Sequence, residues 1–483
     1  MNTWTAYASS VRETLERELK LDVNGAFALP ELPGSPLPER TFTSTYHDTP
    51  ARSLGRAGIT LRRRVENGTS LWQLKLPRAG SATERVELEE PGGPSGPPPD
   101  LARLLLAHAR HGRLEPVATL RTHRSGIRVV DAGHAVADVT VDEVTIVYSE
   151  QGLTGFTELE VELVGQGDEP DLQRLGRVLR DAGAHESDGK PKLMRVLDLP
   201  AQVPPPRSAP LHEQLRHAFE QQLAALEAHD PGVRFGGDPE DLHQLRVATR
   251  RTRALIRATR PLLGDRLSGL GGELKLLGGL LGAVRDLDVL LEHLGPRVAE
   301  LDVDQPRGEE LLAALVAERT IKRNVLVEAM ETRRYADLLD AFRGAIDDLG
   351  PLDAKVDSDA IAARAVRKVR RAAASLPAHP SDDELHAMRI SAKRARYAAE
   401  LAALGGSPKA ARTVKAFKKL QDVIGEHQDA VVAEERLRRA ATPETSIAAG
   451  RLVEHQRLRK REMRDRYPAL LRAAVRTGER AFS

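Results

Sequence analysis

The sequence predicts a two-domain α+β protein: an eight-stranded antiparallel β tunnel (barrel) with flanking helices, then an all-α domain of two pseudo-symmetric four-helix bundles. Three observations support this fold class. Residues 1–200 contain many short segments that alternate apolar and charged residues with period two, which is typical of strands. Residues 210–483 are rich in Ala, Leu and Arg at helical spacing, and their motifs recur between about 210–350 and 357–475. A proline-rich linker at 201–209 separates the two parts.

The composition excludes several classes of protein. The 483 residues carry a formal net charge of +2 although 29% of them are charged, so the distribution of charge matters more than its sum. Cysteine is absent, which excludes disulfides, thiolate metal sites and cysteine nucleophiles. No apolar run approaches the roughly 20 residues that cross a bilayer, and the first residues lack the pattern of a signal peptide. We therefore expect a soluble, cytoplasmic protein with no membrane partner.

Charged residues occupy one face of each predicted strand in the first domain. In the first strand Glu16, Glu18 and Lys20 alternate with leucines. The same alternation recurs in strands that carry Arg62 and Arg64, Gln73 and Lys75, Arg85 with Glu87 and Glu89, Asp138 with Thr140 and Asp142, and Glu158 with Glu160 and Glu162. The dipeptide Asn67-Gly68 predicts a tight hairpin between the second and third of these strands.

Taken one strand at a time, these faces could simply point to solvent, as in ordinary antiparallel sheets. Taken together they favour a closed barrel, because clustered like charges are costly unless they meet ligands or each other. About eight strands suffice to close a barrel, whose apolar faces would pack outward against helices predicted at 101–111 and 171–182. Such an interior suits a metal-bound polyphosphate, since cations hold phosphate oxygens and carboxylates hold a hard divalent cation.

The ordered motifs of this domain resemble the CYTH, or triphosphate tunnel metalloenzyme, family. Glu16-x-Glu18-x-Lys20 resembles the family's ExExK signature, and the later series follows in the family's order over nearly all of residues 12–198. The run Lys190-Pro-Lys192 resembles the family's closing Ser-Lys element with proline in place of serine, so either lysine could enter the tunnel. The resemblance implies an eight-stranded antiparallel barrel that cleaves triphosphates with Mg²⁺ or Mn²⁺.

The same resemblance implies roles for individual residues. The catalytic residues would be Glu16, Glu18 and Lys20. The metal ligands would be the carboxylates Glu16, Glu18, Asp142, Glu158, Glu160 and Glu162. The substrate-binding cations would be Lys20, Arg62, Arg64, Lys75, Arg85, Lys192 and, as alternatives at one position, Arg121 and Arg124.

The helical domain is organised around a basic stripe. At about 100° per residue, His243, Arg246, Arg250 and Arg253 fall within an arc of about 80° on one helix face. Like charges at this spacing oppose helix formation by roughly a few tenths of a kcal/mol each, so a compensating anion is expected. A solvated basic face could explain one stripe. The stripe is repeated 143 residues later, however, as His386, Arg389, Lys393 and Arg396, which favours a polyanion-binding surface.

These stripes, with Arg285-Asp286 and the later Gln428-Asp429, resemble the CHAD domain, a helical module that binds polyphosphate and often follows a CYTH domain. The resemblance spans residues 210 to about 470. It implies anion contacts from His243, Arg246, Arg250, Arg253, His386, Arg389, Lys393, Arg396 and Lys419. We expect Asp286 and Asp429 to hold the arginines in place. The histidines are interpreted as phosphate contacts, with a buried structural role as the alternative.

The sequence therefore predicts a Mg²⁺- or Mn²⁺-dependent triphosphatase whose helical domain binds inorganic polyphosphate. The alternatives are a non-catalytic polyphosphate-binding protein, an adenylate cyclase, or an organic triphosphatase of the same tunnel family. Nucleic acid is not the expected partner, because aromatic residues make up only 3% of the chain and base stacking needs more. The expected location is the cytoplasm, with association with polyphosphate granules as one option.

Overall fold

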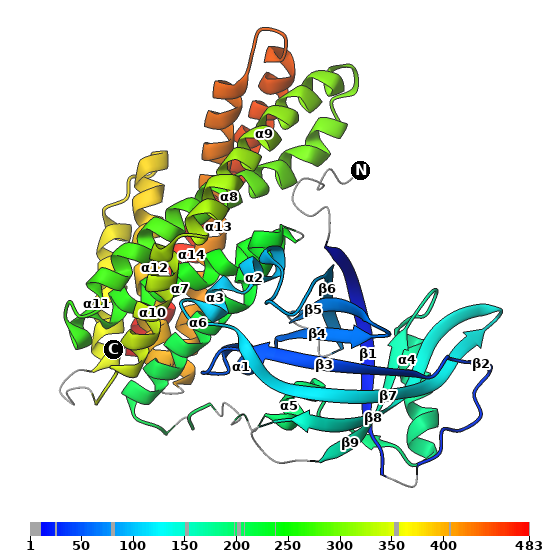
Figure 1. Cartoon of the computed structure of the whole chain (residues 1–483). Helices are drawn as coiled ribbons and strands as arrows, with labels where there is room; N and C mark the ends of the chain where they lie inside the picture. The colour runs from blue at the N-terminus through cyan, green and yellow to red at the C-terminus, as the bar shows by residue number, and fades with distance from the viewer. Residues whose placement is uncertain are drawn as a thin grey trace. The chain divides into compact units, whose positions relative to one another are not determined.

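The computed structural model divides the chain into two compact units, Met1–Gln202 and Val203–Ser483. Figure 1 shows strands in the first unit and helices in the second. The predicted linker at 201–209 lies partly outside the described residues. The structure describes residues 11–24, 27–78, 83–149, 154–197, 199, 204–206, 208–236, 238–351, 357–404 and 407–482.

The first unit is a closed antiparallel barrel of eight strands, which confirms the predicted fold. Closure depends on β1 (Arg12–Asp22), which pairs with β6 (Glu84–Pro91) through its first half and with β9 (Gly155–Leu163) through its second half. The path between them runs through β5 (Thr69–Pro77), β4 (Thr60–Glu66), β3 (Arg40–Asp48), β7 (Glu115–Asp131) and β8 (His134–Tyr148). Two short strands, β2 (Gly34–Pro36) and β10 (His185–Glu186), pair with β7 and β1.

Local sequence determines several of these pairings. Asn67 and Gly68 adopt φ angles of 49° and 80°, and β4 pairs with β5 around them, so the predicted hairpin is confirmed. The alternation of β1 places Glu16, Glu18 and Lys20 on the inner face. Closure of the sheet leaves the barrel without a long unpaired edge among the described strands.

Helices cover the apolar outer faces of the barrel. The helix α4 (Glu169–Asp181) starts at a capping box on Asp168 and buries Leu172, Leu175 and Leu179 against β1, β8 and β9. A second apolar cluster places α5 (Lys192–Val196) against strands β3, β7 and β8. The helix predicted at 101–111 is broken at Leu105 into α2 (Pro99–Leu104) and α3 (Leu106–Ala109). A short helix α1 (Ser53–Arg56) follows β3.

The second unit consists of helices in two successive sets. The first set comprises α6 (Leu211–Phe235), α7 (Pro239–Leu263), α8 (Ser268–Ala299), the short 3₁₀ turn η1 (Asp302–Asp304), α9 (Gln305–Met330) and α10 (Arg333–Asp347). The second comprises α11 (Ser358–Ala374), α12 (Asp382–Ala403), α13 (Pro408–Ala440) and α14 (Ser446–Phe482). Within the described chain, no helix combines the length and apolar character that crossing a membrane requires.

Prolines lie inside helices of this unit without ending them. Pro231 lies inside α6 and Pro296 inside α8, although proline removes one hydrogen bond from a helix. At Pro231 a buried ion pair spans the affected turn, because Arg234 Nε donates to Asp230 Oδ1 at 2.5 Å. Tyr335 of α10 donates to the same carboxylate at 2.8 Å. These tertiary contacts hold the turn that proline weakens.

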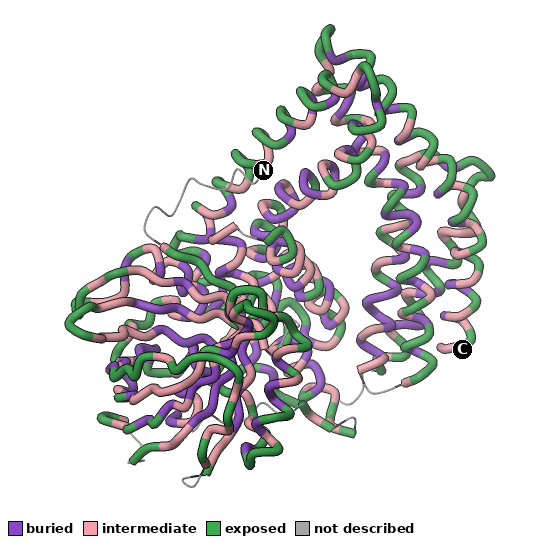
Figure 2. Tube along the Cα trace, turned by 90° about the vertical axis from the view of Figure 1, so that its right-hand side faces the viewer, coloured by how far each residue is buried: buried purple, intermediate pink, exposed green. Residues whose placement is uncertain are grey.

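The two helix sets share a core. One apolar cluster joins α11, α12, α13 and α14 around Phe417, and a second joins α8 and α9 to α13 and α14 around Leu294 and Leu452. Figure 2 shows the buried positions concentrated on the facing sides of packed helices. In addition α7 packs against α12, so the two helices that carry the basic stripes lie side by side.

Candidate functional sites: a charged tunnel and a basic cluster

The interior of the barrel encloses a cavity of about 1050 Å³. The inner faces of the closing strands supply nearly all of its lining, and most lining side chains are charged. Its predicted site residues are Glu16, Glu18, Lys20, Arg62, Arg64, Lys75, Arg85, Arg124, Glu160, Glu162 and Lys192. Segments far apart in the sequence therefore meet in one polar chamber.

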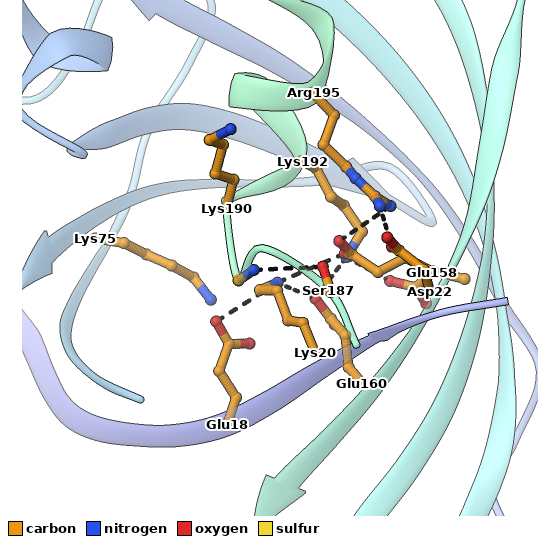
Figure 3. A network of polar contacts seen from close by, with 12 residues as sticks. Glu18, Lys20, Asp22, Lys75, Glu158, Glu160, Ser187, Lys190, Lys192 and Arg195 are labelled. Carbon is orange, nitrogen blue, oxygen red and sulfur yellow. Dashed lines mark hydrogen bonds and ion pairs between the residues drawn. The ribbon is translucent and has the colours of Figure 1, made fainter. Parts of the chain in front are cut away.

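One wall of the tunnel is an internally balanced cluster, which we call the inner network: Lys20, Arg124, Asp142, Glu158, Glu160 and Lys192. Lys192 Nζ lies 2.5 Å from Glu158 Oε2, 2.6 Å from Glu160 Oε1 and 3.0 Å from Asp142 Oδ2. Figure 3 shows Lys20 and Lys192 pointing toward Glu160 from different elements.

Arg124 is the third cation that pairs with carboxylates of the inner network. Its guanidinium lies 2.6 Å from both Asp142 and Glu160. Burial raises the pKa of Glu160, but Lys192, Lys20 and Arg124 outweigh it and hold that pKa well below its usual range. Lys192 and Arg124 likewise outweigh burial and lower the pKa of Asp142, whereas burial outweighs the lysines and raises the pKa of Glu158.

A second set of carboxylates has fewer cation partners than the inner network. It consists of Glu16, Glu18 and Glu162, and we call it the acidic group. Lys75 Nζ lies 2.6 Å from both oxygens of Glu16, and Arg85 lies 3.8 Å from Glu18. Glu162 forms no ion pair with any described residue. Burial, followed by the charges of Glu16, Glu160 and Glu18, raises the pKa of Glu162 to about 7. Lys20 also lies 3.5 Å from Glu18, so within the described part of the chain Glu162 is the member of the acidic group without an ion pair.

The acidic group is therefore where the predicted metal ligands fit a cation. Carboxylate oxygens are suitable ligands for Mg²⁺ or Mn²⁺. Among the described residues, no three acidic or histidine side chains already converge as a formed metal site. Glu18 and Glu162 are paired across β1 and β9, so both carboxylates start from adjacent positions. By contrast Asp142, Glu158 and Glu160 have their oxygens directed to Lys192 and its neighbours.

A cationic wall extends from the acidic group along β4. Arg62 donates to Gln73 at 2.8 Å and to Tyr46 at 3.3 Å, which fixes its guanidinium inside the tunnel. Arg64 lies over the ring of Phe42, 3.9 Å from its centroid, and donates to Glu66 at 2.6 Å. Both arginines keep further donors for an anion in the cavity.

The structure distinguishes between paired candidates that the sequence left open. Arg124 lines the tunnel, whereas Arg121 is exposed on the outer side of β7, so its assignment to substrate binding is wrong. Residues three apart on a strand lie on opposite faces, which explains the difference. Lys192 is buried in the inner network, whereas the side chain of Lys190 is 60% exposed and pairs with Asp188.

Sequence reasoning missed a group of charged residues along the same cavity. Arg128 lies 2.7 Å from Asp138, and Arg40 lies 2.6 Å from Glu66. Arg128 could have been found, because it is four residues after Arg124 and therefore on the same face of β7. Arg40 precedes the alternating part of β3, and nothing in its local sequence indicates the tunnel.

In the helical unit, one arginine of each basic stripe forms an ion pair with a carboxylate. Arg246 of α7 lies 3.0 Å from Asp286, and Arg396 of α12 lies 2.9 Å from Glu400. A glycine faces the equivalent arginine in each repeat. A Cβ at Gly282 would stand 3.5 Å from Arg246, and one at Gly425 would stand 3.8 Å from Arg389. These distances are ordinary contacts, so each guanidinium group packs beside the backbone of the neighbouring helix.

Five further cations of α7 and α12 form a group that we call the basic cluster: Arg250, Arg253, Arg257, Arg389 and Lys393. None of its members forms an ion pair within the described part of the chain. Burial, then Arg250 and Arg389, lowers the pKa of Lys393 to about 8. Burial also lowers the pKa of Arg250, and Arg246, Arg396 and Arg389 act in the same direction. Asp429 interacts with Arg389, as the sequence predicted for this aspartate, and the other members form a concentration of positive charge.

The remaining predicted anion contacts surround this cluster. His243 is partly buried, and burial together with Arg285 lowers its pKa, so its imidazole is neutral near pH 7. His386 Nδ1 lies 3.1 Å from Gln428 Oε1. Lys419 is exposed on α13. The two histidines start their helical stripes in equivalent positions, with different neighbours.

Comparison with known proteins adds the following findings. The family model of the CYTH domain matches residues 14–182, and that of the CHAD domain matches residues 217–438. An uncharacterised protein of Mycobacterium tuberculosis strain CDC 1551 / Oshkosh is 33% identical over 474 residues, covering 88% of each chain. Its counterpart from strain H37Rv matches to the same extent.

Three solved structures are similar to part of the chain. The CHAD domain from Ricinus communis is 26% identical, covers 58% of this chain and 96% of its own, and has a TM-score of 0.48. PptA from Streptomyces chartreusis is 22% identical, covers 55% and 100%, and has a TM-score of 0.46. An adenylyl cyclase candidate from Hippeastrum with a dominant triphosphatase activity is 21% identical, covers 37% and 95%, and has a TM-score of 0.26.

Proposed function

The chain belongs to the family in which a CYTH domain is followed by a CHAD domain, and from this premise we propose that its tunnel hydrolyses triphosphates with Mg²⁺ or Mn²⁺. One observation carries the proposal. A single cavity contains both a group of carboxylates, at Glu16, Glu18 and Glu162, and a wall of arginines and lysines. Such a pairing suits a polyphosphate that arrives with its cation, because each wall compensates one partner.

The protein's own residues have separate tasks in this proposal. Arg62, Arg64 and Arg85 bind phosphoryl oxygens and fix the direction of the phosphate chain. Lys75 pairs with Glu16 at 2.6 Å and would be available to a phosphate oxygen if Glu16 held a metal ion. A bound Mg²⁺ or Mn²⁺ would supply Lewis-acid polarisation of a phosphoryl oxygen. The barrel wall supplies positioning and electrostatic stabilisation, which dominate in phosphoryl transfer.

The inner network has a supporting role in the same scheme. Lys20, Lys192 and Arg124 are held by carboxylates from two neighbouring strands. Because every group in the network has a partner, these cations are fixed before substrate arrives, which lowers the cost of binding. We infer that Asp142, Glu158 and Glu160 position cations here and leave metal binding to the acidic group.

Phosphate release from tripolyphosphate, with and without Mg²⁺ or Mn²⁺, tests this function. We expect the double variant Glu16→Gln/Glu18→Gln to lose at least about 100-fold in kcat/KM, since charge stabilisation of this kind is worth several kcal/mol. Glu13→Gln is the matched control, because it makes the same substitution on an exposed position of β1. The absence of release in the wild type with either metal would remove the hydrolase proposal.

A non-catalytic polyphosphate-binding protein is the second candidate function. The self-neutralised inner network favours it to some degree, because fixed cations bind an anion without chemistry. The acidic group argues against it, since a binder of polyanions gains nothing from unpaired carboxylates such as Glu162. Equilibrium binding of tripolyphosphate without turnover would support this second function. ATP in the same assay tests the cyclase and organic triphosphatase alternatives through their distinct products.

We also propose that the basic cluster of the helical unit binds inorganic polyphosphate. The support is the convergence of unpaired cations from α7 and α12, with carboxylates confined to its margin. Retention on immobilised polyphosphate should decrease steeply with salt, because the contacts are electrostatic. Arg250→Glu/Lys393→Glu should abolish retention. Arg364→Glu/Lys368→Glu, on the exposed face of α11, reverses the same charge and should have a smaller effect. Competition with nucleic acid tests the alternative polyanion.

A further inference from the structure

One end of the tunnel carries an arginine that lies outside the alternating pattern of the sequence. Arg40 is at the start of β3 and lines the same cavity as the acidic group. Its side chain is 49% exposed, whereas those of Arg64 and Arg124 are 14% and 23% exposed. Arg40 therefore lies closer to solvent than these neighbours, at a mouth of the tunnel.

Three guanidinium groups meet at this mouth, and we call Arg40, Arg64 and Arg124 the mouth arginines. Two of them share the ring of Phe42: the guanidinium carbon of Arg64 lies 3.9 Å from its centroid and that of Arg124 lies 5.8 Å from it. Arg40 is directly opposite Arg124 in the pairing of β3 with β7, and it precedes Phe42 by two residues on the same strand face. Like charges that face each other destabilise a sheet, so this arrangement favours a bound anion.

Glu66 is the carboxylate that pairs with two of the mouth arginines. Arg40 donates to it through Nε and Nη2, each at 2.6 Å, and Arg64 Nη2 donates to it at 2.6 Å. Arginine binds carboxylates and phosphates through the same planar fork of donors, so Glu66 occupies the place that a phosphoryl group would take. Glu39, which also lines the cavity, is largely exposed and lies 3.8 Å from His123. The pair of Arg40 with Glu66 is partly exposed and contributes little to stability, so an anion can replace it.

Strand β4 sets the order of groups from the acidic group to the mouth. Lys75, which contacts the acidic group, lies opposite Thr60 at the start of β4. Arg62, Arg64 and Glu66 follow on the same strand face, each about 7 Å from the next. A phosphate chain bound at the acidic group and Arg62 therefore passes Arg64 before it reaches Glu66. The cavity of about 1050 Å³ is as large as the sites of drug-sized ligands and larger than a triphosphate needs.

We propose that the mouth arginines bind a fourth phosphoryl group, so that Arg40 and Glu66 determine which chain length of polyphosphate the tunnel prefers. This specificity rests on the proposed hydrolysis of triphosphates in the same cavity. A triphosphate at the acidic group leaves the pair of Arg40 with Glu66 in place. A longer chain displaces the Glu66 carboxylate and gains the donors of Arg40. Arg40 thus favours longer chains and Glu66 disfavours them, which are the attractive and repulsive elements of specificity.

Initial rates of the full chain with tripolyphosphate and with tetrapolyphosphate test the proposal. The quantity measured is the ratio of kcat/KM for tetrapolyphosphate to kcat/KM for tripolyphosphate. Arg40→Gln should lower this ratio by at least about fivefold, through a higher KM for tetrapolyphosphate, because a charged bidentate contact is lost. Glu66→Gln removes the competing carboxylate and should raise the ratio by about threefold. An unchanged ratio in Arg40→Gln, or a lower ratio in Glu66→Gln, overturns the proposal.

Two further variants separate a subsite from general attraction of anions. Arg17→Gln is the matched control, because Arg17 is 46% exposed, pairs with Glu84 at 3.1 Å and lies outside the residues that line the cavity. It should leave the ratio unchanged. Arg40→Lys keeps the charge without the planar fork and should restore less than about half of the lost ratio. Full restoration by lysine would contradict a bidentate subsite.

Equilibrium binding distinguishes failure of the subsite from failure of the hydrolase proposal. Both chains are titrated in excess chelator into the Arg250→Glu/Lys393→Glu variant, so that the basic cluster does not contribute. A preference for tetrapolyphosphate that Arg40→Gln removes would support the subsite even if the wild type released no phosphate. Hydrolysis of both chains without any effect of Arg40→Gln on their ratio would remove the subsite and leave the hydrolase. Circular dichroism of each variant confirms that the protein remains folded.

Discussion

The tunnel and the basic cluster hold positive charge in opposite ways. In the tunnel, Lys20, Lys75 and Lys192 each lie within 4 Å of at least one carboxylate. In the basic cluster, Lys393 and Arg250 face other cations, and the carboxylates Asp286 and Glu400 hold outer arginines instead. The difference indicates two kinds of ligand. A tunnel with both charges suits an anion together with a metal ion, whereas a purely cationic cluster suits an anion alone.

Removal of divalent metal should produce the largest difference between hydrolysis in the tunnel and polyphosphate binding by the basic cluster. With excess chelator, hydrolysis of tripolyphosphate in the tunnel should fall by at least about 100-fold, because no protein group replaces the metal near Glu16 and Glu18. Retention on polyphosphate should change by less than about twofold, since the basic cluster has no carboxylate to hold a metal. Parallel assays of phosphate release and retention measure both quantities. If retention were lost together with hydrolysis, the basic cluster would not bind anions on its own.

The inner network should show the next largest effect, on stability. Lys192→Met removes the cation that contacts Asp142, Glu158 and Glu160, all of which are buried. Breaking a buried charge pair by removing one partner costs about 3 kcal/mol or more, so the free energy of unfolding in urea should decrease by that amount. Lys190→Met is the matched control and should change it by less than about 0.5 kcal/mol, because Lys190 is largely exposed.

Strand periodicity explains what the sequence could reveal about the tunnel. Alternation places Glu16, Glu18 and Lys20 on one face, and the structure has all of them inside. The same rule excludes Arg121 once Arg124 is known to face inward. Alternation does not predict which charged side chains pair with one another inside the barrel. The contact between Lys192 of α5 and Glu158 of β9 joins segments 34 residues apart, and it depends on the packing of α5 against the barrel.

In the helical unit, too, the local sequence predicts some features, and the packing of helices determines others. The repeated stripe predicts which faces of two helices are basic, since it needs only a period of 3.6 residues. Proline is a less reliable marker of helix ends in this unit, because Pro231 and Pro296 lie inside helices. Their cost is offset by tertiary contacts such as that between Asp230 and Tyr335, which sequence periodicity does not contain. Likewise, the low pKa of Lys393 arises from the packing of α7 against α12.

Glu162 should make the stability of the metal-free protein depend on pH. Its folded pKa of about 7 lies above the ordinary value, so the folded state binds the proton more tightly than the unfolded state. Stability should therefore decrease as pH rises from about 4.5 to about 7, by on the order of 1–2 kcal/mol from this group. Glu162→Gln should remove that slope, measured by urea unfolding between pH 5 and 8. Saturating Mg²⁺ should remove it in the wild type, and an unchanged slope would place the metal elsewhere.

The smallest expected effect is a change in polyphosphate affinity when Asp286, at the margin of the basic cluster, is substituted. Asp286 is about half exposed in its pair with Arg246, and such pairs contribute less than about 1 kcal/mol. In Asp286→Asn the carboxylate no longer competes with phosphate for Arg246, so polyphosphate affinity at low salt should rise by about twofold to threefold. Asp265→Asn is the control. It removes the carboxylate that pairs with Arg260, which lies on α7 as Arg246 does. A fivefold loss of affinity would instead show that Asp286 positions Arg246, and would make the margin of the cluster part of its binding site.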